Sequence, residues 1–160
     1  MSTSTQLNSW AEKYIPKGFL GVFAADRLPE PDVVATVADA QGLTSLICNY
    51  DPHDLPGSHW VACRIEQHSV AWFDSYGLAP DADDLILGHT THFAPWLTSV
   101  CQQLKLKSYT WSTLDLQSLA ASTCGHYALW YCRNGPTRGW EGFGSDTTGN
   151  DSLIRELVRV

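Results

Sequence analysis

Apolar residues recur along the chain at two spacings, one typical of helices and one typical of strands. Helical spacing is present over residues 33–40, 93–104, 124–133 and 153–158. Gly42 follows the first of these stretches and Asn134-Gly135 follows the third, and glycine is a common helix end. The spacing therefore predicts four helices.

The remaining apolar blocks are typical of strands. Residues 43–50 predict one strand, and residues 109–113 predict another because apolar and polar positions alternate there. Residues 59–65 and 70–75 carry apolar side chains at both parities, as expected of strands buried on two faces. Residues 51–57 hold two prolines and a glycine and predict a loop. Helices and strands are mixed rather than strictly alternating, which predicts an α+β fold.

The length of 160 residues corresponds to one domain with a sizeable core, which we expect over residues 1–160. Hydrophobic residues make up 44% and charged residues 17%, so the chain is not disordered by composition. Residues 1–9 are polar and are expected to form a flexible N-terminal tail. Residues 135–149, where Gly and Pro cluster, are also expected to be loose.

The net charge and the hydropathy of the chain argue against nucleic acid and membranes as its main partners. Ten basic and 17 acidic residues give a net charge of -7, and no run of Lys or Arg is present that would follow a phosphate backbone. The first residues lack the pattern of a signal peptide, and no apolar stretch is long enough to cross a bilayer. We therefore expect a soluble protein of a reducing compartment, neither secreted nor bound to membrane or strongly to nucleic acid.

Two residues of the predicted hairpin, His59 and Asp74, can be brought together from their numbering. With a two-residue loop at residues 67–68, His59 lies opposite Tyr76 and is a diagonal neighbour of Asp74 on one face. A loop one residue earlier would place His59 and Asp74 directly opposite each other. In either register the carboxylate can orient the imidazole through a hydrogen bond. Each residue alone is more often structural, so the pair needs a third group.

Cys124 is the candidate for that third group. It follows Ser122-Thr123, which can cap a helix, and precedes the apolar stretch 125–130. The positive end of a helix favours a thiolate, and an adjacent imidazolium favours it further. Seven residues earlier, Gln117 can aim its amide at the same place as the Cys124 backbone N–H, and two such donors form an oxyanion hole. The alternatives are a core cysteine and a solvated amide.

The other four cysteines lie within apolar strand or helix patterns and are expected in the core: Cys48, Cys63, Cys101 and Cys132. No CxxC pair and no His/Cys spacing of a closed zinc site is present, so we expect neither a disulfide framework nor structural zinc. His53, His89 and His92 are expected to face solvent. We therefore expect no metal site and no cofactor.

Four segments of the chain carry a family resemblance. They are GFLGVF at 18–23, GSHW at 57–60, WFDSYG at 72–77 and TCGHYA at 123–128. Together with Gln117 they resemble the adenain family, the maturation cysteine proteases of adenoviruses and related DNA viruses. The order His, Asp, Gln, Cys matches that family, whereas papain-like enzymes place Cys before His. The resemblance covers most of residues 18–134.

The resemblance implies a cysteine-type endopeptidase, a hydrolase in which His59 is the base, Asp74 orients it and Cys124 is the nucleophile. It implies that Gln117 completes the oxyanion hole and that Trp60 lines a substrate tunnel selecting glycine-like residues. Core packing is the alternative for Trp60, because it points to the strand face opposite His59. The implied fold is a mixed central sheet flanked by helices, with the nucleophile at the N-terminus of a buried helix.

The implied substrates are capsid or core precursor proteins of a DNA virus, cleaved at glycine-containing sites during virion maturation. The implied places of action are the virion and the nucleus or cytoplasm of the host cell. Adenovirus enzymes also use an activating peptide and DNA. An activating peptide stays open as a partner, while the acidic charge balance predicts no tight dependence on DNA.

Two other functions stay open. Proteases that remove SUMO or other ubiquitin-like modifiers share the catalytic arrangement and the glycine preference of the adenain family. A binding module that has lost catalysis is the third reading. It is disfavoured because competent residue types fill all four catalytic positions.

Overall fold

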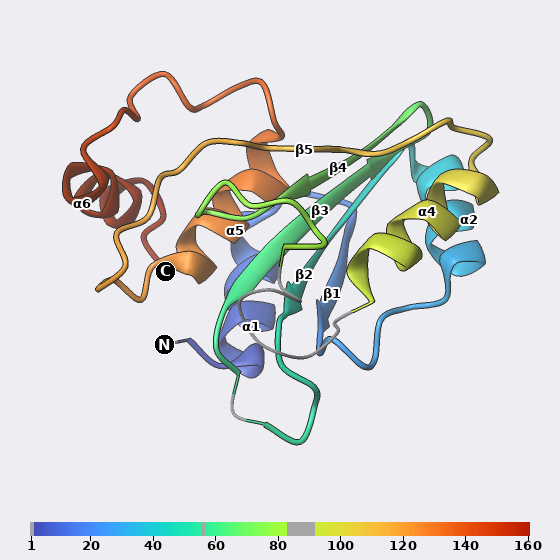
Figure 1. The fold of residues 1–160 in the computed structure, drawn as a ribbon, viewed down its shortest axis with the longest axis horizontal. Helices are drawn as coiled ribbons and strands as arrows, with labels where there is room; N and C mark the ends of the chain where they lie inside the picture. The colour runs from blue at the N-terminus through green and yellow to red at the C-terminus, as the bar shows by residue number, and fades with distance from the viewer. Residues whose placement is uncertain (1, 56, 83–91) are drawn as a thin grey trace.

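The centre of the protein is a mixed β-sheet whose strands follow in chain order across the sheet (Figure 1). The structure is a computed structural model that describes residues 2–55, 57–82 and 92–160. The strands in these ranges are β1 (Phe19–Phe23), β2 (Leu43–Asn49), β3 (Trp60–Glu66), β4 (Ser69–Phe73) and β5 (Thr110–Trp111). The outer pairs, β1 with β2 and β4 with β5, are parallel, and the inner pairs are antiparallel.

Helices cover both faces of this sheet. One face carries α1 (Ser4–Tyr14) and α5 (Cys124–Asn134), and the other carries α2 (Pro31–Gln41) and α4 (Phe93–Gln103). Helix α6 (Thr147–Leu157) packs on α5, outside the sheet (Figure 1). The expected α+β fold with a mixed central sheet flanked by helices is confirmed, and Cys124 is the first residue of the buried helix α5.

The apolar residues at both parities of the central strands divide between two cores. Val61 and Cys63 belong to the cluster under α2 and α4, whereas Ala62 and Ile47 belong to the cluster under α1 and α5. Each of these four side chains is fully buried. Because successive side chains of a strand point to opposite faces, a strand covered on both sides is apolar throughout.

The predicted helix ends are confirmed where glycine follows a helix. Gly42 ends α2 with a φ of 79°, in the left-handed region that glycine adopts without steric cost. Gly135 ends α5 with a φ of 80°, and its N–H donates to the Tyr131 carbonyl. Pro31 is the first residue of α2, where its missing N–H is not needed.

The hairpin of β3 and β4 has the register predicted from a two-residue loop at residues 67–68. Glu66 pairs with Ser69, and Ala62 pairs with Phe73. Continued beyond the paired residues, this register places His59 opposite Tyr76. The end of the hairpin therefore brings His59 and Asp74 to the same edge of the sheet.

The N-terminal residues differ from the expected flexible tail over residues 1–9, because α1 begins at Ser4. The Thr3 side chain accepts the Gln6 N–H at 3.1 Å, and the Gln6 side chain accepts the Thr3 N–H at 2.9 Å. Such a capping box satisfies two N–H groups that a helix start leaves unpaired. Leu7 and Ala11 are fully buried and hold α1 in the core. Because few of its residues are apolar, α1 shows no clear apolar stripe in the sequence.

The segment expected to be loose, residues 135–149, packs on the core through aromatic side chains. The ring of Trp140 stacks on Phe73 with 5.3 Å between centroids, and Phe143 lies 6.1 Å from Tyr127. Glycines and prolines shape the path of the backbone here, while the aromatic residues between them anchor it. The segment expected to be loose is therefore in contact with the core through Trp140 and Phe143.

Two elements have other bounds than predicted. Helix α6 begins at Thr147, well before residue 153, and its inner side includes the polar Asn150 and Asp151. These two buried polar residues interrupt the apolar stripe, so the pattern showed only the second half of the helix. The strand expected over residues 109–113 pairs only at Thr110 and Trp111, at the exposed edge of the sheet.

Candidate active site

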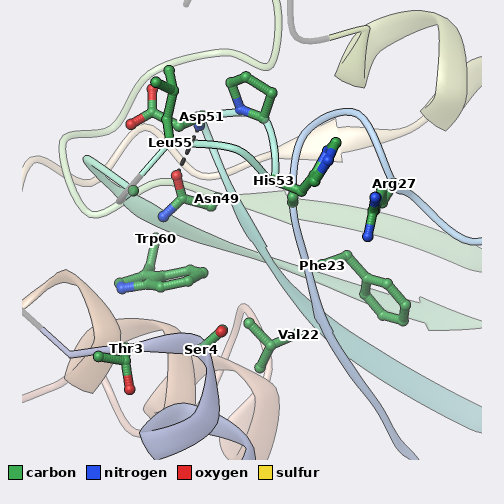
Figure 2. Close-up of a pocket in the computed structure, with 13 residues that line it drawn as sticks. Thr3, Ser4, Val22, Phe23, Arg27, Asn49, Asp51, His53, Leu55 and Trp60 are labelled. Carbon is green, nitrogen blue, oxygen red and sulfur yellow. Dashed lines mark hydrogen bonds between the residues drawn. The ribbon is translucent and has the colours of Figure 1, made fainter.

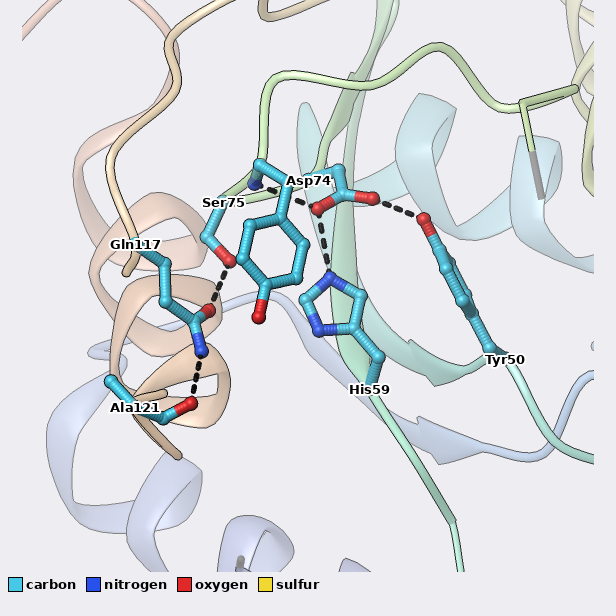
Figure 3. Close-up of polar contacts among 7 residues, drawn as sticks. Tyr50, His59, Asp74, Ser75, Gln117 and Ala121 are labelled. Carbon is cyan, nitrogen blue, oxygen red and sulfur yellow. Dashed lines mark hydrogen bonds and ion pairs between the residues drawn. The ribbon is translucent and has the colours of Figure 1, made fainter. Parts of the chain in front are cut away.

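His59 and Asp74 form a buried pair at the end of the central hairpin (Figure 3). His59 directly precedes β3, and Asp74 directly follows β4. The His59 Nε2 atom lies 2.8 Å from Asp74 Oδ1. Asp74 is fully buried and His59 is 7% exposed. A charge-assisted hydrogen bond shielded from water fixes the imidazole in one orientation, with Nδ1 facing away from the carboxylate.

Two tyrosines, Tyr50 and Tyr76, contact both members of this pair. The Tyr50 hydroxyl, at the end of β2, donates to Asp74 Oδ2, and the Tyr76 N–H donates to Asp74 Oδ1 at 2.9 Å. Tyr50 contacts the His59 ring edge-on at 4.9 Å between centroids, and Tyr76 stacks on it at 4.8 Å. Neither tyrosine was predicted to belong to the site, although the hairpin register already placed Tyr76 opposite His59. The imidazole is therefore held by ring contacts as well as by Asp74.

Cys124 lies beside His59, at the start of α5. It is the first residue of α5 and is 3% exposed. Its thiol lies close enough to His59 to raise the pKa of that imidazole. Since Asp74 occupies Nε2, the nitrogen left for the thiol is Nδ1. The structure thus brings the predicted residues His59, Asp74 and Cys124 together, with the imidazole between the other two.

Opposing effects act on the pKa of His59. Burial lowers it, because the interior disfavours a charged ring, whereas the interactions with Asp74 and Cys124 raise it. The raising effects prevail, and the pKa of His59 is about 9 instead of the ordinary 6.5. His59 therefore keeps its proton at neutral pH.

The other four cysteines are buried, as expected from the sequence: Cys48, Cys63, Cys101 and Cys132. Burial raises the pKa of each of these thiols, that of Cys132 to about 12. A thiol with a raised pKa stays protonated and is a poor nucleophile. Contact with His59 is therefore what sets Cys124 apart, since all five cysteines are buried.

Gln117 lies on the loop that leads into α5 and is 3% exposed. Its side-chain carbonyl accepts the Ser75 hydroxyl at 2.6 Å, and its Nε2 donates to the Ala121 carbonyl at 2.8 Å (Figure 3). Within the described part of the chain, its side chain forms no hydrogen bond with Cys124 or His59. One Nε2 hydrogen remains for a further acceptor, because a carboxamide nitrogen carries two.

The expectation that Ser122-Thr123 caps the helix through a side chain is corrected by the structure. Thr123 occupies the position before α5, but its side chain makes no capping hydrogen bond. Its hydroxyl donates to Asp151 of α6 instead, at 2.9 Å. The first backbone N–H groups of a helix have no partner within the helix. Those of α5 are therefore left without a side-chain cap from Thr123.

Trp60 packs in the core and also lines a cavity of about 540 Å³ (Figure 2). Its indole N–H donates to the Ser2 carbonyl at 3.0 Å, and its ring reaches to within 3.7 Å of where a Cβ at Gly125 would lie. Val22, Phe23 and Leu55 line the same cavity. Trp60 therefore lines this cavity and also lies beside Gly125 at the start of α5.

The described residues contain no group of three or more His, Cys, Asp or Glu side chains placed to hold a metal ion. His53 contacts Asp26, with 2.6 Å between Nδ1 and Oδ2, and the half-exposed pair faces solvent. His92 precedes α4, and His89 lies outside the described residues. Of the helices in the described ranges, none has the length and hydropathy to span a membrane.

No protein-family profile matches the chain, and no curated protein sequence matches it. Solved structures to which the chain is similar include the ASFV pS273R protease, with a TM-score of 0.47 and 22% identity, over 74% of this chain and 45% of that one. ChlaDub1 from Chlamydia trachomatis has a TM-score of 0.47 and 15% identity, over 73% of this chain and 58% of its own.

A third similar structure is the SUMO protease Ulp1 with its catalytic cysteine oxidized to a sulfinic acid. It has a TM-score of 0.43 and 15% identity, over 95% of this chain and 73% of that one. The chain spans about half the length of the first two structures, 45% and 58%.

Proposed function

We propose that the protein is a cysteine endopeptidase with Cys124 as nucleophile, His59 as general acid and base, and Asp74 as the group that orients His59. The observation that carries this proposal is a buried imidazole that is hydrogen-bonded to Asp74 through Nε2 and lies beside the thiol of a cysteine at a helix start. An imidazolium in contact with a thiol stabilises the thiolate, which is the nucleophilic form.

In the first half of the reaction, the Cys124 thiolate attacks the carbonyl carbon of the scissile peptide bond. The carbonyl oxygen becomes an oxyanion, for which the Cys124 backbone N–H and the free Nε2 hydrogen of Gln117 are the proposed donors. The C–N bond then breaks as the His59 imidazolium gives its proton to the leaving amine. The acyl group remains on Cys124 as a thioester, and His59 is neutral.

In the second half, neutral His59 takes a proton from water, and the hydroxide attacks the thioester carbonyl. The C–S bond breaks, the carboxylic acid leaves, and the thiolate and imidazolium are restored. Asp74 keeps the imidazole in place through both halves, because its hydrogen bond to Nε2 leaves Nδ1 directed at the reacting atoms.

The proposed substrates are proteins cleaved after glycine. Trp60 lines the cavity of about 540 Å³ and lies beside Gly125 at the start of α5, so we propose that a peptide bound in that cavity reaches Cys124 past the indole. Residues without a side chain pass such an aromatic wall most easily. The resemblance over residues 18–134 supports a maturation protease of a DNA virus as the biological assignment.

The test is covalent capture by a peptide electrophile that ends in Gly-Gly. Intact mass should show one adduct per chain, and peptide mapping should place it on Cys124. A peptide that ends in Val-Val is the matched control and should react far more slowly, because its side chains meet Trp60. Slow labelling scattered over several cysteines would contradict the proposal.

The same assay separates a maturation protease from a deconjugating enzyme. Folded SUMO and ubiquitin with a C-terminal electrophile are added beside the short peptide. Faster capture of a folded modifier than of its own C-terminal peptide would favour the deconjugase, because only that function needs a surface for the modifier. Capture of short peptides alone supports the endopeptidase.

Replacing Gln117 by alanine is expected to lower kcat by about 10²- to 10³-fold with little change in KM. The reason is that one donor to the oxyanion is lost, which matters only once charge develops on the substrate oxygen. The measurement is steady-state hydrolysis of a Gly-Gly peptide together with alkylation of Cys124 by iodoacetamide. Alkylation creates no oxyanion and should keep its rate.

The matched control is Ser75→Ala, which removes the hydroxyl that donates to the Gln117 side chain. That variant keeps the amide and its Nε2 hydrogens, so its kcat should fall much less. A Gln117→Ala enzyme with unchanged kcat would remove Gln117 from the oxyanion hole.

A further inference from the structure

Helix α6 contributes a buried carboxylate to the loop that leads into α5. Asp151 is 3% exposed and, with Asp74, is one of two buried aspartates among the described residues. It takes part in no ion pair in these ranges. A buried carboxylate without a cationic partner is costly unless several hydrogen bonds stabilise its charge. The groups that donate hydrogen bonds to Asp151 therefore indicate its structural role.

Three groups donate to Asp151. The Thr123 hydroxyl and the Tyr127 hydroxyl both donate to Oδ1 at 2.9 Å, and the Ser118 backbone N–H donates to Oδ2 at 3.2 Å. Ser118 directly follows Gln117, and Thr123 directly precedes Cys124. The Asp151 carboxylate thus binds both ends of the segment 118–123, which joins the proposed oxyanion donor Gln117 to the proposed nucleophile Cys124.

The contact with Thr123 has a second consequence. A threonine before a helix ordinarily turns its hydroxyl to the helix and accepts one of the first N–H groups. Here the hydroxyl donates to Asp151, and Thr123 has φ -94° and ψ 3° rather than the extended backbone of a capping residue. Asp151 therefore holds Thr123 away from the N–H groups at the start of α5.

The neighbouring Asn150 holds the other side of Gln117. Its Nδ2 donates to the Leu116 carbonyl at 3.2 Å and to the Gly144 carbonyl at 2.8 Å. The Tyr127 hydroxyl also lies 3.3 Å from the Leu116 carbonyl. The residues on both sides of Gln117 are thus fixed by contacts to α6 or to a tyrosine that Asp151 binds.

We propose that Asp151 is a positioning residue of the active site, which sets the distance and orientation between Gln117 and Cys124 through Ser118 and Thr123. The inference rests on the proposed peptidase function. It adds α6, an element outside the family resemblance, to the groups that build the oxyanion hole. Asp151 touches no reacting atom and acts only through the loop that it binds.

The experiment compares Asp151→Ala, Asp151→Asn and Ile154→Val. Alanine removes all three acceptor contacts, and a displacement of catalytic groups by about 1 Å costs about 10²-fold, so we expect kcat to fall by about 10²-fold with KM nearly unchanged. Asparagine keeps one oxygen for the Ser118 N–H, and its amide can donate to the two hydroxyls, which can rotate to accept. It should recover most of kcat.

Ile154→Val is the matched control, because Ile154 is a fully buried residue of the same helix that contacts the loop through no hydrogen bond in the described chain. It loosens the packing of α6, so a role of Asp151 in stability alone would give Asp151→Ala and Ile154→Val the same kcat per folded molecule. Equal kcat values for these two variants would overturn the proposal.

Hydrogen exchange supplies a measurement that does not depend on turnover. The Ser118 amide should exchange faster in Asp151→Ala than in the parent, while amides of α4 keep their rates. If the parent cleaves no peptide, the peptidase proposal fails, and the exchange rates still decide whether Asp151 holds the loop. Unchanged exchange over residues 116–124 would overturn the positioning role.

Should Asp151→Ala fail to fold, Thr123→Val takes its place. Valine has the shape of threonine without the hydroxyl, so it removes one contact to Asp151 and leaves the carboxylate with two. A clear fall in kcat with unchanged KM supports the proposal. Parent-like kcat in Thr123→Val would overturn it.

Discussion

Replacing Cys124 by alanine is expected to abolish turnover, with a loss on the order of 10⁴-fold or more, while the protein keeps its fold. The loss follows because the thioester cannot form without the sulfur, and what remains is the binding of the transition state. The fold should persist because the side chain is small and makes no backbone contact that holds α5. The free energy of unfolding should fall by on the order of 1 kcal/mol. Peptide hydrolysis and thermal unfolding measure the two effects.

Cys132→Ala is the control for this experiment. Cys132 lies on the same helix two turns later, is equally buried, and does not contact His59. Its replacement should cost similar stability and leave turnover intact. Turnover that survives in Cys124→Ala, or is lost only in Cys132→Ala, would show that the nucleophile has been assigned wrongly.

Replacing Asp74 by asparagine is expected to lower kcat/KM by on the order of 10³-fold or more with the fold intact. The asparagine oxygen can accept from both His59 and the Tyr76 N–H, as Asp74 Oδ1 does. Its amide then faces the Tyr50 hydroxyl, which can turn and accept. The contacts are thus kept while the negative charge that stabilises the imidazolium is lost.

The Asp74→Asn substitution should also shift the pH dependence of kcat/KM in a defined direction. In the parent, His59 keeps the proton for the leaving amine until the pH approaches its pKa of about 9, so the acylation rate should fall as pH rises through that value. Loss of the Asp74 charge lowers the pKa of His59. The alkaline fall in rate should therefore begin at lower pH in Asp74→Asn. The measurement is kcat/KM of peptide hydrolysis between about pH 6 and 10.

Tyr50→Phe separates the charge of Asp74 from its hydrogen-bond network. Phenylalanine removes one donor to the carboxylate and keeps both the charge and the bond to His59. In Tyr50→Phe, the pH at which kcat/KM falls on the alkaline side should shift less than in Asp74→Asn. If Asp74→Asn shows the parent's rate and pH profile, Asp74 has no part in orienting His59.

How far the candidate site could be predicted depended on the range of the interaction. The two-residue turn after β3 sets the hairpin register, so the nearness of His59 and Asp74 followed from their numbering. Cys124 could be placed at a helix start because Ser122-Thr123, which can cap a helix, precede it and the apolar stretch 125–130 follows it. Tyr50 could not be found, because its contact with Asp74 crosses from β2 to the loop after β4.

The sequence by itself determined the central strands, the register of their hairpin and the ends of α2 and α5, because periodicity, turns and glycine ends act over a few residues. The tertiary structure alone decided that α1 packs in the core through Leu7 and Ala11, that aromatic residues of 135–146 pack on the core and that α6 binds the loop before α5. Asn150 and Asp151 read as surface residues in a pattern of polar and apolar positions. They are buried because donors and acceptors more than twenty residues away, such as Thr123 and Leu116, satisfy them, and only the folded chain brings those groups together.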